Sequence, residues 1–128
     1  MGLAKRIWWA EAEMLVVERG LMVRYLEPWA STESQDEAIG KAFRKQLEVE
    51  VARGHVLYGL PVQLIARGNG DDALFEILDG SSRVAEVHLT WKNGKESLPW
   101  PHTTVYSGVE EWAEKSMLPA HEEWLAGE

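Results

Sequence analysis

Two of the four histidines and two of the seven tryptophans lie within residues 84–103, on either side of an Asn-Gly pair. If the first half of this stretch is a β-strand, Glu86 and His88 point to the same face, because alternate side chains of a strand share a face. A histidine with carboxylates beside it can act as a general base or bind a metal ion. We therefore take His88, Glu86 and, from an earlier strand, Glu76 as the candidate catalytic residues.

Aromatic and hydroxyl side chains follow His88 in the sequence and supply the expected wall of a ligand pocket. We expect Thr90, Trp91, Trp100 and His102 to line this pocket, since ligand sites combine apolar walls with a few polar groups. An ordinary structural interpretation stays open beside it. Carboxylates opposite a histidine also form simple cross-strand pairs, worth about 0.2–1 kcal/mol each.

Other motifs exclude several classes of site. The run His121-Glu122-Glu123 has no second histidine at the spacing of a zinc-protease helix. The sequence Gly68-Asn69-Gly70 lacks the lysine of a phosphate-binding loop and leads into a strand. No serine lies in a Gly-x-Ser-x-Gly sequence, and the chain has no cysteine. We predict neither a metal site nor a cofactor.

A sheet must position the candidate residues. After residue 54, apolar and polar side chains alternate with a two-residue period, which is typical of β-strands. Strands are expected at residues 61–67, 73–78 and 84–91, with a short edge strand at 103–106. Asn-Gly and Asp-Gly pairs between these segments favour tight hairpin turns. The connections are too short for parallel crossovers, so the strands should form an antiparallel meander.

Helices are expected before and after the sheet. A three- to four-residue apolar period indicates a helix over residues 3–27, although helix and strand both remain open for residues 20–27. A second helix should begin at a Ser34 cap. A third should begin at Ser107, where Glu110 completes a capping box.

The predicted fold class is α+β, with three to four antiparallel strands packed on one face by two N-terminal helices and a C-terminal helix. Residues 1–128 should form a single domain, in which residues 1–54 are helical, residues 55–106 form the sheet and residues 107–126 form the last helix. The second face of the sheet, which carries His88, is then left open.

The charge of the chain restricts its partners. The formal net charge is −8, and residues 61–128 hold five basic and twelve acidic side chains. Such a surface repels phosphate backbones and anionic lipids and attracts cationic protein surfaces. No apolar stretch approaches the roughly 20 residues of a membrane span. We expect a cytoplasmic protein that binds neither nucleic acid nor membranes.

Seven tryptophans are more than one small core needs. The periodicity places Trp91, Trp112 and Trp124 in the core, whereas Trp29 and Trp100 lie in loops beside proline. Tryptophan is enriched at interfaces because it combines a large apolar area with a donor. The surplus predicts a homodimer.

Four short patterns mark the second half of the chain. They are His55-x-Leu57-x-Gly59, Asp71-Asp72-x-Leu74-Phe75, Val87-His88-Leu89-Thr90-Trp91 and Pro101-x-Thr103-x-x-Tyr106. Together they resemble a family of small bacterial proteins encoded on mobile genetic elements such as integron cassettes. The resemblance covers about residues 55–125 and implies a bacterial protein. It carries no activity, cofactor or catalytic residue with it.

Three classes of function remain open. The first is a non-catalytic binding protein that engages a basic protein partner, in the manner of an immunity protein or an adaptor. The second is a small enzyme or ligand-binding domain with its pocket on the sheet face around His88. An oligomeric domain that acts through complex formation is a third possibility.

Overall fold

The chain folds around an antiparallel sheet whose strands follow one another in sequence order. The computed structural model describes residues 23–33 and 35–127. The sheet contains five strands in this part of the chain: β1 (Ala30–Ser31), β2 (Val62–Arg67), β3 (Asp72–Ile77), β4 (Val84–His88) and β5 (Thr103–Tyr106). The helices are α2 (Glu37–Glu50), α3 (Val109–Trp112), the π-helical segment η1 (Ala113–Met117) and α4 (Leu118–Ala126).

The α+β class and the antiparallel meander are confirmed. Gly70 and Gly80 adopt positive φ angles of 64° and 86° in the turns on either side of β3, which few other residues accept without strain. Two details differ from the prediction. The two-residue strand β1 adds a fifth strand at one edge, and β4 ends at His88 instead of continuing to residue 91.

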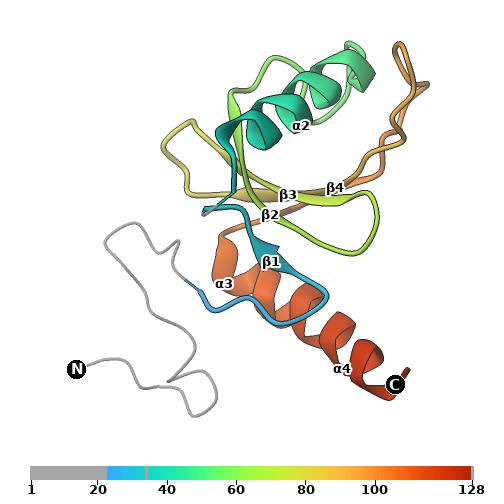
Figure 1. Cartoon of the computed structure of the whole chain (residues 1–128). Coiled ribbons are helices and arrows are strands. Elements are labelled where there is room, and N and C mark those ends of the chain that lie inside the picture. The colour runs from blue at the N-terminus through green and yellow to red at the C-terminus, as the bar shows by residue number, and fades with distance from the viewer. Residues whose placement is uncertain (1–22, 34, 128) are drawn as a thin grey trace.

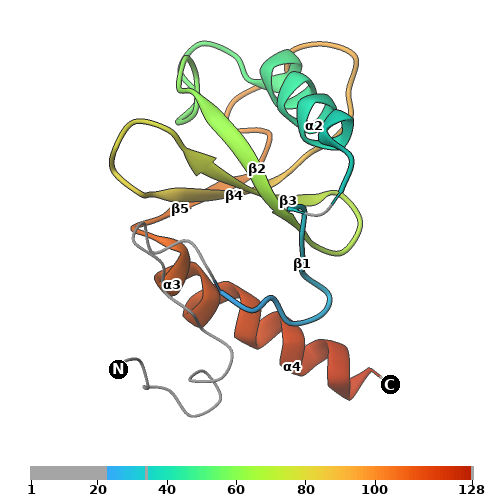
Figure 2. The ribbon, with the colours of Figure 1, turned by 60° about the vertical axis from the view of Figure 1, so that its left-hand side comes forward.

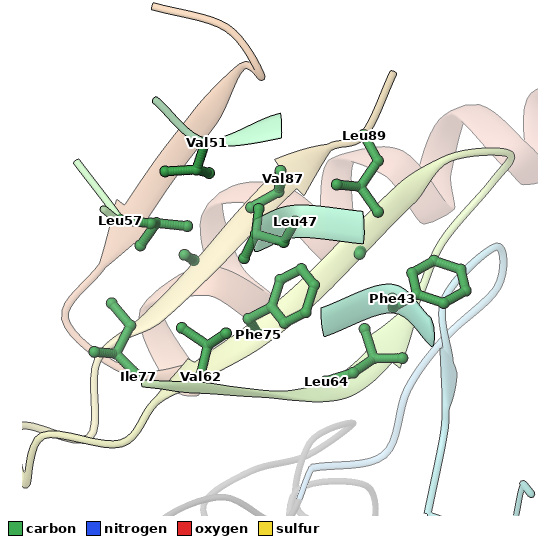
Figure 3. Packing of buried hydrophobic residues seen from close by; sticks show 12 residues of the cluster. Phe43, Leu47, Val51, Leu57, Val62, Leu64, Phe75, Ile77, Val87 and Leu89 are labelled. Atoms are coloured by element: carbon green, nitrogen blue, oxygen red, sulfur yellow. The ribbon is translucent and has the colours of Figure 1, made fainter. Parts of the chain in front are cut away.

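Helix α2 covers one face of the sheet. Its cap is Asp36, whose Oδ1 accepts a hydrogen bond from the N–H of Ala38 at 3.0 Å, so the helix begins later than a Ser34 cap predicts. The buried side of α2 packs on alternate residues of β2, β3 and β4 (Figure 3). The members of this cluster that Figure 3 labels are Phe43, Leu47, Val51, Leu57, Val62, Leu64, Phe75, Ile77, Val87 and Leu89.

The C-terminal helices cover the opposite face, so the prediction of a sheet packed on one face only is wrong. Figures 1 and 2 show α2 on one side of the strands and α3 with α4 on the other. Trp112 and Met117 are fully buried there against Leu74 and Val84. The reason lies in β3, where both Leu74 and the adjacent Phe75 are inaccessible to solvent. A strand with apolar residues on both faces requires a cover on each.

The C-terminal helix is continuous but changes its hydrogen-bond pattern before Pro119. The N–H of Leu118 donates to the carbonyl oxygen of Ala113, five residues back, which is the pattern of a π-helix. Proline has no N–H to donate, and the wider turn accommodates it. The start of the helix also differs from the prediction. Glu111, not Glu110, reaches back and accepts the N–H of Ser107 at 2.6 Å.

The predicted first helix falls mostly on residues 1–22, which lie outside the described residues. Residues 23–26 are neither helix nor strand.

The tryptophans are distributed differently from the prediction. Trp29, which the sequence places in a loop, is buried, with 3% of its surface exposed, and its ring meets the Trp112 ring edge-on at 5.0 Å. Conversely, Trp91 and Trp124 are 43% and 37% exposed and are not core residues. Within the described residues, no helix has the length and hydropathy to cross a bilayer.

Candidate functional site

Glu86 holds the C-terminal helix against the sheet. Its Oε1 accepts a hydrogen bond from the indole N–H of Trp112 at 2.8 Å and another from the hydroxyl of Ser116. Buried indole N–H groups need such an acceptor. The carboxylate that the sequence assigns to an open, catalytic face is therefore partly buried between β4 and the helix.

His88 lies at the exposed end of β4, away from the helix. The side chain is 55% exposed, and its Nδ1 lies 2.7 Å from Oδ1 of Asp72. The hydrogen bond with Asp72 raises the pKa of His88, because the carboxylate stabilises the imidazolium. The pair has the geometry of a histidine oriented by a carboxylate, with Nε2 left for another contact.

The register of the β3–β4 hairpin decides which carboxylate meets His88. Asp72 is directly opposite His88, whereas Glu76 is opposite Val84 and Glu86 is opposite Leu74. The structure therefore brings neither Glu76 nor Glu86 to His88. Counting back from the turn at residues 79–82 would have identified Asp72, because the turn fixes the pairing.

The four expected pocket residues belong to the β4–β5 loop, which the buried carboxylate of Glu50 holds. The N–H of Thr90 lies 3.0 Å from Glu50 Oε1, and the N–H of Trp91 lies 2.7 Å from Oε2. Trp91 has a φ of 60° and packs edge-on against Phe43 at 5.2 Å. The Thr90 hydroxyl donates to Glu96 at 2.6 Å. These groups shape the loop.

Trp100 and His102 lie further along the same loop. Both are exposed, and their ring centroids are 6.0 Å apart. The carbonyl oxygen of His102 accepts the backbone N–H of His88 at 3.0 Å, which continues the β4–β5 pairing. This arrangement brings His102 beside His88 through main-chain contact.

The other histidines are committed to the backbone. In His55, which is buried, Nδ1 accepts the N–H of Leu57 at 3.0 Å, so the ring proton on Nε2 donates to the carbonyl oxygen of Pro101 at 2.9 Å. His121 Nδ1 lies 2.6 Å from the carbonyl oxygen of Glu27. Across residues 23–33 and 35–127, no three histidine or acidic side chains cluster as metal ligands do.

A groove of about 790 Å³ lies between the first half of α2, the outer edge of β2 and the chain that precedes β1. Glu76, only 6% exposed, is the one candidate catalytic residue that lines it. The ionic lining consists of four carboxylates and two basic groups, from Glu33, Asp36, Glu37, Glu76, Lys41 and Arg44. The groove is therefore large enough for a ligand and mainly acidic.

The pKa of Tyr25 reflects the negative charge of the residues that line this groove. Its half-buried ring contacts Trp112, with 5.8 Å between the ring centroids. Burial raises the pKa of Tyr25 to about 12, and the negative charges of Glu33 and Glu76 add to the increase. The hydroxyl therefore stays protonated at neutral pH, and the same field favours a cation in the groove.

Sequence reasoning missed Tyr25 and Glu33 as site residues, because both precede the sheet and show no motif. Gly40 in the first half of α2 is a usable signal in the sequence. A glycine inside a helix costs about 1 kcal/mol relative to alanine, so it calls for a local reason. Here Gly40 lines the groove.

Comparisons with protein-family models, with curated proteins and with solved structures found no match to the chain.

Proposed function

We propose that the chain is a non-catalytic binding protein that engages a basic protein partner through the groove beside α2. The observation that carries this proposal is the acidic lining of the 790 Å³ groove, in which the carboxylates of Glu33 and Glu37 are exposed while Glu76 is buried. Exposed carboxylates attract a cationic partner over long range, and a buried one strengthens the local field.

The charge of the whole chain supports the same class of partner. With a net charge of −8, the surface accelerates association with a cationic protein at low salt. This contribution is screened as ionic strength rises, because the Debye length falls from about 10 Å at 0.1 M to about 3 Å at 1 M. Binding should therefore weaken with added salt.

The alternative function, a small enzyme or ligand-binding domain around His88, is favoured by one observation. His88 and Asp72 form a close pair of the kind that orients a general base. The pair lies on an exposed strand end, and its neighbours Thr90 and Trp91 are held by Glu96 and Glu50. A base on an open surface does not exclude water from a reacting group, so we rank this function second.

Two further parts of the proposal concern assembly and origin. Trp91, Leu98 and Trp100 are 43%, 52% and 47% exposed in the β4–β5 loop and offer apolar area to a second copy. We therefore retain the proposal of a homodimer, which light scattering tests by giving a dimeric or a monomeric mass. A bacterial and cytoplasmic origin, which the family resemblance implies, is part of the same proposal.

The test of the proposed function uses a short fluorescent peptide of alternating lysine and valine. It should bind the full chain saturably, and the binding should weaken at high salt. Replacing Glu33 and Glu37 together by glutamine should weaken binding several-fold. The control replaces Glu122 and Glu123 of α4 by glutamine, which gives the same net charge but leaves the groove unchanged. Equal loss in both variants, or no saturable binding, would contradict the proposal.

A further inference from the structure

The outer edge of β2 has a strand partner over only part of its length. Strand β1 pairs with Ala66 and Arg67 alone. The next contacts come from Thr32, whose N–H donates to the carbonyl oxygen of Ile65 at 3.1 Å and whose hydroxyl donates to that of Leu64 at 3.3 Å. Within the described chain, no strand pairs with residues 62–64 on this side.

The pairing with β3 determines which groups of residues 62–64 face this edge. The N–H of Leu78 donates to the carbonyl oxygen of Pro61 at 2.8 Å, which makes Val62 a residue whose own polar groups point away from β3. The two-residue repeat gives Leu64 the same orientation. The N–H and C=O of Val62 and the N–H of Leu64 therefore point to the outer edge, where backbone groups require partners.

This edge forms the floor of the acidic groove. Helix α2 lies above β2 and β1 lies below it (Figure 2). The N-terminal half of α2 forms one wall of the groove, and Val23 and Tyr25 contribute to the other. At Gly40, an added Cβ would meet no atom within 4 Å. The wall next to the edge is thus open at the position where α2 has no side chain.

A buried acceptor in the groove also lacks a donor. The side-chain oxygen Oε1 of Gln35 is buried and has no hydrogen-bond partner among the described residues. Gln35 lines the groove near the start of α2. An unsatisfied buried polar atom costs about 1–3 kcal/mol, so a turn of the Gln35 side chain that lets it accept a donor from a bound segment is favourable.

We propose that the groove binds an extended, cationic segment of a partner protein, which adds a strand to β2 at Val62 and Leu64. This inference rests on the proposed function and specifies its geometry. Main-chain hydrogen bonds at a sheet edge supply affinity, and alternate side chains supply specificity. One set points to the α2 wall beside Gly40, where there is room for an apolar side chain. The other set points toward Gln63 and Glu76, where a lysine or arginine meets the field of the carboxylates.

The experiment compares the lysine–valine peptide with a copy that is N-methylated at alternate backbone amides. Methylation leaves charge and side chains intact but removes the donors that a strand uses. We expect the unmethylated peptide to bind roughly tenfold more tightly, which is about 1.4 kcal/mol, and to protect the amides of Val62 and Leu64 from hydrogen exchange. Binding of both peptides with equal affinity would overturn strand addition while leaving the proposed function in place. Binding of neither would overturn both.

A pair of variants at one position tests the location independently. Gly40→Ala should keep peptide binding, whereas Gly40→Trp should block it by filling the groove. Circular dichroism would establish that both variants fold, and equal affinity of the two folded variants would overturn the proposed location.

Hydrogen exchange of the protein without peptide provides a last check. Protection of the Val62 and Leu64 amides without peptide would show that the chain's own residues 1–22 occupy the edge, and protection that grows with concentration would indicate a second copy. Either result overturns the proposal.

Discussion

The β4–β5 loop depends on one buried carboxylate, and its removal gives a quantitative prediction. Glu50 is fully buried, and it receives the N–H groups of Thr90 and Trp91 and the side-chain amide of Gln46. The backbone beside these hydrogen bonds is unusual, since Trp91 adopts a positive φ of 60°. This conformation costs a residue other than glycine about 1–2 kcal/mol, which the charged hydrogen bonds offset.

The substitution Glu50→Gln replaces one acceptor oxygen by a donor. One backbone N–H then faces another donor, at a cost of about 1–3 kcal/mol, and the remaining hydrogen bonds lose the contribution of the charge. We expect the free energy of unfolding to fall by about 2–3 kcal/mol. For a chain of this size, that lowers Tm by about 10 °C.

Urea denaturation and a thermal melt measure this loss. The matched control is Glu48→Gln, two residues earlier on the exposed side of α2, where the change should remain within about 0.5 kcal/mol. Hydrogen exchange gives a local readout, since the amides of Thr90 and Trp91 should exchange faster in Glu50→Gln only. If both variants unfold at the same urea concentration, the carboxylate does not hold the loop and the reasoning is refuted.

Three other predictions follow from the surroundings of single residues. Gly68→Ala should destabilise the fold by about 1–3 kcal/mol in urea denaturation, because the new Cβ would lie 2.8 Å from the buried Trp29 ring; unchanged stability would mean that the ring is free to move. Gly40→Ala should stabilise α2 by about 1 kcal/mol, because the new methyl group meets no neighbour and alanine favours helix; a lower Tm would contradict this. Asp72→Asn should lower the pKa of His88, measured by NMR, because the hydrogen bond with Asp72 is the main cause that raises it. In the unsubstituted chain this pair stabilises the fold below the ordinary pKa of 6.5 and loses that effect as pH rises through the raised pKa of His88; a His88 titration that Asp72→Asn leaves unchanged would show that the pair is not formed in solution.

The strands were predictable from the sequence because their signals are local. Alternation between residues 61 and 89 and the turn pairs around Gly70 and Gly80 determine a meander without further information. Strand β1 was not predictable, because two residues carry no period. Its pairing depends on where the chain returns to β2, which is a tertiary contact.

The placement of the helices was harder to predict, because apolar residues on both faces of β3 do not say which helix covers which face. Leu74 and Phe75 are adjacent and both buried, which was the available signal for two covers. The alternation in β4 alone therefore predicts an open face at Glu86 and His88, whereas the indole of Trp112 packs there and donates to Glu86.

The candidate site was predicted in part. Glu76 lines the groove, and His88 has a carboxylate partner, but that partner is Asp72, because the register of the β3–β4 hairpin places Asp72 opposite His88. The groove itself depends on α2, β2 and the segment around Tyr25 meeting in space. No residue spacing within a single helix or strand indicates that these segments lie together. The one signal in the sequence is Gly40, a glycine inside a helix.

The most direct test of the central claim is to locate a bound cationic peptide by NMR on the full chain. The account predicts intermolecular contacts between the lysine side chains of the peptide and the ring of Tyr25, together with shifted amide signals at Val62 and Leu64. Contacts with Trp91 and Trp100 of the β4–β5 loop, without any at Tyr25, would contradict it.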